Sequence, residues 1–251
     1  MDYRKRLEEI PLGVREDFER VRRHIEKMKK MELLRDSLKY TCDPKSNFQI
    51  YEFFGDAFLE NYLSMLVIHE GDLMPPPVRG EIKRYVQNQK KRNGEKVVWN
   101  EWYSDEFMRA KQKEKTVEDS VCNVVLCLVY YYLGLKDFCF GPQKPREVRL
   151  EIGGMESTDA LRMKYPSMRK KQQDHDAGNL PPDEEKKYEE WMEMKKCADV
   201  VESIIGECDY LSSRVSNGTV CSVCGTLARD IAKLAVFVGH YLRDFAALYR
   251  P

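Results

Sequence analysis

The sequence contains no long hydrophobic run. The longest stretch of uninterrupted apolar residues, from Val124 to Leu133, is far shorter than an α-helix needs to cross a lipid bilayer. The first residues, MDYRKRLEEIPLG, contain acidic side chains and no apolar core, so they resemble neither a secretory signal nor a clean transit peptide. We therefore expect a protein without a membrane-spanning segment.

The sequence also lacks net charge and the motifs of several enzyme classes. Lys plus Arg and Asp plus Glu each number 42 among the 251 residues, so the total charge gives no indication of a nucleic-acid partner. There is no G-x-S-x-G, Walker A or H-E-x-x-H pattern, and the four histidines have no catalytic spacing. These absences argue against a serine hydrolase, a P-loop ATPase and a zincin-type metalloprotease.

The eight cysteines are not arranged as a disulfide framework. Several lie inside apolar runs, in a chain large enough to bury a core without disulfides. We therefore expect reduced thiols and an intracellular protein, in the cytoplasm, nucleus or mitochondrion. Cys221 and Cys224 form a C-x-x-C pair that could supply half of a zinc site. Because two further ligands are missing nearby, a turn with small buried thiols is the preferred interpretation.

Helical periodicity dominates the chain. Apolar residues recur at the spacing of one helix face or, in the segment VCNVVLCLVYYYLGL, almost all round. The predicted helices cover residues 14–39 (as one or two helices), 48–69, 78–89, 117–135, 182–211 and 226–248. Turn-forming segments separate them, including the triple proline at 75–77 and a turn at 212–225. The expected fold class is all-α.

Residues 136–182 differ in character from the predicted helices. They are rich in turn formers and charges, so we expect a long, exposed polar insertion. No internal repeat is evident. The chain therefore divides into an N-terminal extension, 1–13, and a single helical domain, 14–251, that contains this insertion.

Two pairs of acidic residues interrupt apolar helices. Glu52 and Asp56 are four residues apart, so their side chains project from one face of a helix. The second pair, Asp199 and Glu202, is three residues apart and shares a face in the same way. If the two helices packed together, four carboxylates would surround a hard cation, best suited to Mg²⁺ or Mn²⁺.

An acidic pair at helical spacing also has a simpler explanation. Such pairs are usually solvated or neutralised by basic side chains, and spacing alone is a weak indication of a metal. Lys195 and Lys196 precede Asp199 by four and three residues and could neutralise it locally. A lysine that filled the space between the two pairs would argue against a metal centre.

Two segments resemble the ribonuclease III family. The segment YEFFGDAFL, which contains Glu52 and Asp56, looks like the signature helix of that family. The segment ADVVESIIG, which contains Asp199 and Glu202, is similar to its second acidic motif, and the two occur in the family's order. The resemblance touches most of residues 30–250, but these two motifs carry it.

The resemblance implies an all-α endonuclease domain that hydrolyses double-stranded or structured RNA in RNA processing, leaving 5′-phosphate and 3′-hydroxyl ends. It implies that the catalytic residues are also the ligands of Mg²⁺ or Mn²⁺, namely Glu52, Asp56, Asp199 and Glu202. It further implies a two-fold dimer, either a homodimer or a heterodimer with another ribonuclease III-like chain. Apolar residues of the signature helix, among them Phe53, Phe54 and Phe58, could then contact the partner as well as the core.

The chain departs from the family pattern in three ways. The family usually has another acid three residues before the first ligand, where this chain has the neutral Gln49. The segments at 94–118 and 136–182 are longer than a minimal family domain needs, and no double-stranded-RNA-binding domain is expected after the last helix. These departures favour an alternative function, a non-catalytic ribonuclease III-like subunit that binds RNA or serves as a structural partner in an RNA-processing or ribosomal complex.

RNA binding by a chain of zero net charge would require local basic clusters, because duplex RNA is recognised largely through its shape and its phosphates. The candidate residues are Lys83, Arg84, Lys90, Lys91 and Arg92. A solvated helix end is the simpler interpretation of any one cluster.

Overall fold

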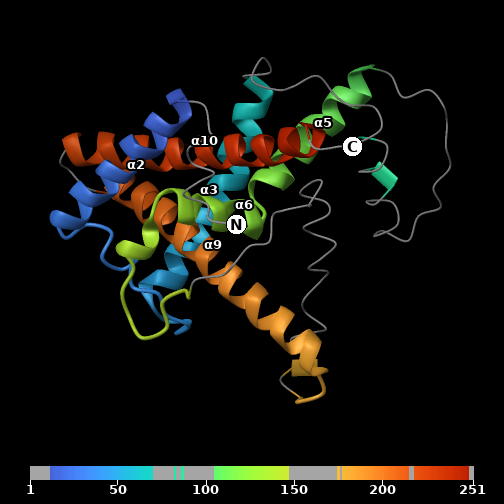
Figure 1. Cartoon of the computed structure of the whole chain (residues 1–251). Helices are drawn as coiled ribbons and strands as arrows, with labels where there is room; N and C mark the ends of the chain where they lie inside the picture. Colours follow the sequence, from blue (N-terminus) through green and yellow to red (C-terminus); the bar gives the residue numbers. More distant parts are fainter. Residues whose placement is uncertain are drawn as a thin grey trace.

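The computed structural model describes residues 12–69, 82, 86–87, 105–146, 174–175, 177–214 and 218–248. Its helices are α2 (Leu12–Lys30), α3 (Asn47–His69), α5 (Asp105–Ser120), α6 (Asn123–Tyr132), α9 (Pro182–Arg214) and α10 (Gly218–Leu248), with a 3₁₀ turn η2 (Leu135–Asp137) (Figure 1). Within these residues, β-type pairing is limited to an isolated bridge between Lys39 and Phe140. The predicted all-α class is confirmed.

The core forms around α6. Its residues from Val124 to Tyr132 are all buried, as the absence of a polar face in this segment predicts. The central part of α9 packs on α6, and α10 covers α9. The N-terminal part of α9 extends away from the other helices (Figure 1), and the buried core residues of this long helix begin at Met194.

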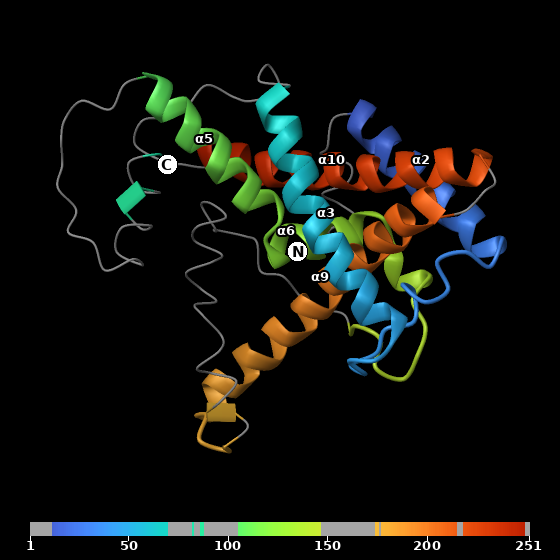
Figure 2. The same ribbon diagram turned by 180° about the vertical axis from the view of Figure 1, so that it is seen from behind.

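The prediction of one continuous helix over 117–135 is wrong. α5 ends at Ser120 and α6 begins at Asn123, with Cys122 in an extended conformation between them (φ −74°, ψ 144°). The break allows the mainly polar α5 and the largely apolar α6 to run in different directions (Figure 2). Periodicity within one segment does not report such a change of direction.

The first predicted helix ends earlier than its periodicity indicates. α2 stops at Lys30, after which Glu32 (φ 59°) and Leu34 (φ 62°) adopt the left-handed conformation. A partner far along the chain holds this turn, because the Ser37 backbone N–H donates to Glu207 Oε2 (2.9 Å) on α9. A contact over such a separation in the chain is invisible to local sequence patterns.

The turn expected at 212–225 is also shorter than predicted. α9 continues to Arg214, and α10 begins at Gly218. Cys221 and Cys224 therefore lie in the first turns of a helix rather than in a turn.

Two glycines allow α3 and α9 to cross in very close contact (Figure 2). A Cβ atom at Gly55 would lie 1.8 Å from the carbonyl oxygen of Glu202, and one at Gly206 would lie 2.0 Å from the carbonyl oxygen of Tyr51. Ser203 adds a hydrogen bond from its hydroxyl to the carbonyl of Phe48 (3.2 Å). Backbone therefore touches backbone at this crossing, which brings both acidic pairs into one region.

The helix predicted at 48–69 was expected to be largely buried, and this expectation is wrong for one of its faces. The exposed fractions are 45% for Ile50, 71% for Phe53 and 43% for Phe54. Phe58 is half-buried against the core. The signature segment thus presents large apolar side chains to solvent next to its acids.

Several predictions fall outside the described residues. These are most of the helix predicted at 78–89, most of the insertion at 136–182, and residues 1–11 of the N-terminal extension. They stay predictions, as does the division into 1–13 and 14–251.

Candidate metal centre

Three of the four predicted ligands meet at the crossing of α3 and α9. One carboxylate oxygen each from Glu52, Asp199 and Glu202 lie within 4.8 Å of one another. Asp199 and Glu202 are buried, with 4% and 7% of their surface exposed. A buried acidic triad of this kind could hold a metal ion, because carboxylate oxygens are the ligands that hard divalent cations prefer.

Asp56 is the fourth predicted ligand, and it is placed differently. It is exposed and does not belong to the group of three oxygens. It lies one helical turn beyond Glu52, a shift of about 6 Å along the axis. Asp56 nevertheless faces the same cavity, so it could contact a ligand held further from the triad.

The four acids line one open cavity of about 430 Å³. This space is large enough for a hydrated cation together with part of a second ligand. The lining residues are Gln49, Glu52, Phe53, Asp56, Val121, Asn123, Lys195, Asp199 and Glu202. Sequence patterns did not indicate Val121 and Asn123, because they come from the unpredicted break between α5 and α6.

Lys195 bridges two of the acids. Its ammonium donates to Asp199 Oδ1 (2.5 Å) on its own helix and to Glu52 Oε1 (3.3 Å) on α3. The suggested local neutralisation of Asp199 is thus present for Lys195, whereas Lys196 pairs with Glu193 instead. Lys195 therefore lies between the two acidic pairs, the arrangement expected to argue against a metal centre. Among the described residues it has no ion pair with Asp56 or Glu202, so its ammonium neutralises only part of the negative charge.

Burial shifts the protonation of this cluster. Desolvation is the main cause that raises the pKa of Asp199 to about 6, against the opposing charge of Lys195. Desolvation, helped by the charges of Asp199 and Asp56, raises the pKa of Glu202 to about 8. Burial is the largest single influence on the pKa of Lys195 and lowers it, but the charge and hydrogen bond of Asp199, together with the charges of Glu52 and Glu202, outweigh burial and raise the pKa overall. The site therefore has more negative charge than its surroundings compensate.

We expect the stability of the metal-free protein to fall as the pH rises from about 5 to about 8. The folded protein keeps a proton on Glu202 up to a pKa of about 8, whereas the unfolded chain releases it near 4.5. Such a shift is worth roughly 5 kcal/mol at about 1.4 kcal/mol per pKa unit. The stabilisation is present below the unfolded pKa and is lost as the pH rises through the folded one.

Urea midpoints at pH 5.5 and 8.5, with EDTA or with Mn²⁺, measure this dependence. Mn²⁺ should raise the midpoint more at pH 8.5, because it replaces the protons held by the carboxylates. Glu202→Gln should flatten the EDTA profile. If the urea midpoint of Glu202→Gln in EDTA fell with pH as steeply as that of the wild type, groups other than Glu202 would cause the pH dependence.

Gln49 and Tyr40 lie beside the acids. Gln49 donates to the carbonyl of Thr41 (3.2 Å) and faces both the main cavity and a smaller adjoining one of about 150 Å³. Burial, followed by the charge of Asp199, raises the pKa of Tyr40. Gln49, where the family usually has an acid, therefore contributes an amide and no charge to the wall of the site.

The thiol pair gives no indication of a zinc site. The Cys221 thiol contacts the carbonyl of Leu211 (3.9 Å), and Cys224 is buried against Cys208. None of the eight cysteines, all of them described, forms a disulfide. In the part of the chain that the structure describes, the acidic triad is the one group found whose geometry could hold a metal ion.

The predicted RNA contacts Lys83, Arg84, Lys90, Lys91 and Arg92 lie outside the described residues. No described helix is long and apolar enough to span a lipid bilayer.

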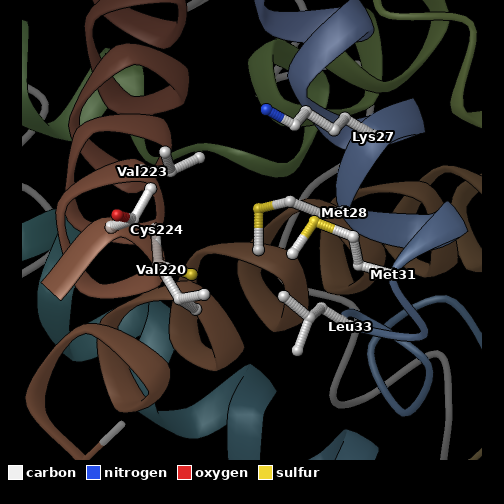
Figure 3. Close-up of a pocket in the computed structure, with 8 residues that line it drawn as sticks. Lys27, Met28, Met31, Leu33, Val220, Val223 and Cys224 are labelled. Atoms are coloured by element: carbon white, nitrogen blue, oxygen red, sulfur yellow. The ribbon is translucent and has the colours of Figure 1, made fainter. Parts of the chain in front are cut away.

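A separate pocket of about 50 Å³ lies between the end of α2 and the start of α10 (Figure 3). Met28 and Met31 face Val220 and Val223 across it, and Lys27 is its one charged lining residue. Because it has neither carboxylates nor a buried nucleophile beyond the Cys224 thiol, this pocket does not suit metal-dependent hydrolysis.

Comparison of the chain with protein-family models, curated proteins and solved structures finds no match. The site therefore has to be interpreted from its own chemistry.

Proposed function

We propose that the chain is a divalent-metal-dependent endoribonuclease of the ribonuclease III type that cleaves double-stranded or structured RNA. The observation that carries this proposal is the meeting of Glu52 with Asp199 and Glu202, whose oxygens lie within 4.8 Å although they come from distant segments. The two segments are the ones that resemble the acidic motifs of that family. Mg²⁺ or Mn²⁺ would be held by these three acids, with Asp56 at the edge of the site.

The residues suit phosphodiester hydrolysis without a protein nucleophile. A bound Mg²⁺ would stabilise negative charge on the phosphoryl oxygens and supply an activated water. Glu52, Asp199 and Glu202 would orient the cation, and the close crossing of α3 and α9 keeps them together. Lys195 lines the same cavity, and once a cation displaces its ammonium from Glu52 and Asp199, the ammonium could contact the phosphate backbone.

The proposal includes a partner chain. The apolar side chains of Ile50, Phe53 and Phe54 are exposed beside the cavity, and such a cluster usually marks a protein interface. A second copy, or another ribonuclease III-like chain, would cover this face and place two cavities on one RNA duplex.

A second candidate function follows from Lys195. Because this ammonium already bridges Glu52 and Asp199, part of the cluster is neutralised without a metal. This arrangement suits a non-catalytic ribonuclease III-like subunit that acts as an RNA-binding or structural partner in an RNA-processing or ribosomal complex. Such a subunit would need no metal ion in the cavity.

The direct test incubates the purified protein with a labelled RNA duplex in Mg²⁺, in Ca²⁺ and in EDTA. The proposed enzyme should cut the duplex in Mg²⁺ but not in Ca²⁺ or EDTA, and should leave 5′-phosphate ends. If no duplex is cut in Mg²⁺ or Mn²⁺, by the chain alone or with a partner, the non-catalytic function replaces the enzymatic one.

Lys195→Met distinguishes the two candidates by metal binding. A metal must displace the ammonium from its charge-assisted hydrogen bonds, so removing the ammonium should tighten Mn²⁺ binding by roughly tenfold or more. Isothermal titration of both proteins with Mn²⁺ measures the change. The enzyme candidate requires that the wild type also binds Mn²⁺, whereas binding by Lys195→Met alone supports a lysine that replaces the metal. Lys196→Met serves as the control, because Lys196 pairs with Glu193 and not with the acids of the site.

A further inference from the structure

The cavity of the acids is also lined by the N-terminus of a helix. α6 begins at Asn123, and Asn123 and Val121 face the cavity. Cys122 has no side-chain capping hydrogen bond at this helix end. The first hydrogen bond of the helix is from Leu126 N to Cys122 O (3.1 Å), so the N–H groups of residues 123–125 have no acceptor within the helix.

These N–H groups also have no acceptor among the other described groups. The first two residues after Asn123 are buried, with exposed fractions of 5% for Val124 and 0% for Val125. Because Val121, Cys122 and Asn123 are only half-buried, and Val121 and Asn123 face the cavity, the donors at this helix end are open to water or to a bound ligand.

Glu202 provides a second, independent indication of a ligand. Only 7% of its surface is exposed, and it faces the same cavity. Its carboxylate has no hydrogen bond or ion pair with a described residue, unlike that of Asp199, which pairs with Lys195. An ionised buried carboxylate without a partner is costly, and a cation bound in the cavity would supply that partner.

The two indications call for opposite charges. Glu202 and the other acids favour a cation, whereas the N-terminus of α6 favours an anion, because the helix dipole and the free N–H groups both attract negative charge. Lys195 adds a positive charge to the same cavity. A cation that carries a phosphate group satisfies both requirements with one ligand.

We propose that the N-terminus of α6, together with the Asn123 amide, is the phosphate-binding part of this cavity. It receives a non-bridging oxygen of an RNA phosphodiester whose cation is held by the acids. Asn123 acts as a positioning residue through its side-chain N–H donors. This inference rests on the proposed function, because it assumes that a divalent cation binds the acids.

The test uses Asn123→Asp in the full chain with Mn²⁺ and inorganic phosphate as probes. The substitution keeps the shape of the side chain but repels an anion, and an acid in the first turn suits the helix dipole, so the fold is retained. Paramagnetic relaxation of the ³¹P signal by protein-bound Mn²⁺ should show phosphate binding in the wild type and about tenfold weaker binding in the variant. Electron paramagnetic resonance should show undiminished Mn²⁺ binding in both.

Thr219→Asp, which places an acid in the first turn of α10 and away from the cavity, should behave as the wild type. Equal phosphate binding by wild type and Asn123→Asp, with Mn²⁺ bound to both, would overturn the role of α6 and leave the metal centre standing. Absence of Mn²⁺ binding in the wild type would overturn the proposed function and this inference together. An unchanged urea midpoint for Asn123→Asp excludes unfolding as the cause of weaker binding.

Discussion

Replacing Glu202 by Gln, or Asp199 by Asn, is expected to reduce RNA cleavage by roughly 10²–10³-fold, the scale on which single preorganised electrostatic groups act. Both changes keep the volume of the side chain and remove the charge that would hold the cation. The proposed ligands Glu52 and Asp56 should follow the same trend. Asp56 should have the smaller effect on metal affinity, because it stands apart from the three oxygens that lie within 4.8 Å.

Stability should change in the opposite direction to activity. Because Glu202 is buried and its pKa is raised to about 8, a neutral amide at this position removes the cost of ionising a buried group at high pH. Glu202→Gln should therefore be more resistant to urea than the metal-free wild type at pH 8.5. Cleavage rates and urea midpoints measured on the same samples separate loss of chemistry from loss of fold.

Asp209→Asn is the matched control, since Asp209 lies on α9 outside the cavity. It should cleave at the wild-type rate. A Glu202→Gln variant that also cleaves at this rate would refute the assignment of the site.

Replacing Gly206 by Ala is expected to destabilise the fold by about 3 kcal/mol, at the upper end of the usual cost of overpacking. The new Cβ would lie 2.0 Å from the carbonyl oxygen of Tyr51 and 2.8 Å from the backbone nitrogen of Gly55. These neighbours are backbone atoms, so no change of side-chain rotamer relieves the overlap. The helices α3 and α9 have to separate, which moves Glu52 away from the acids on α9.

The consequence should be visible both in stability and at the site. Urea unfolding should give a lower midpoint for Gly206→Ala, and Mn²⁺ should protect this variant less than the wild type. Gly218→Ala is the control, because a Cβ there meets no atom within 4 Å. If Gly206→Ala were as stable as this control, the close crossing would not be the feature that assembles the site.

Local patterns were sufficient for α3 and α9, whereas they missed most of α5 and the start of α10. The apolar spacing around Phe48 and along residues 182–211 predicted α3 and α9 to within a few residues, because periodicity reflects which face of a helix is buried. The same patterns failed at the break before Asn123 and at the left-handed turn near Leu34. A contact between distant segments holds the turn near Leu34, namely the hydrogen bond from the Ser37 N–H to Glu207.

For the candidate site, too, the sequence predicted the local arrangement and the tertiary packing decided the rest. Spacing within one helix was enough to place Glu52 with Asp56, and Asp199 with Glu202, on common faces, because a residue and its neighbours three or four positions away share one side of an α-helix. The packing of α3 on α9 settled which of these acids meet. This packing left Asp56 at the edge of the site, placed the Lys195 ammonium against Glu52, and gave a cavity that the N-terminus of α6 also lines. The sequence could not predict these positions, because the register of two crossing helices depends on backbone contacts between segments far apart in the chain.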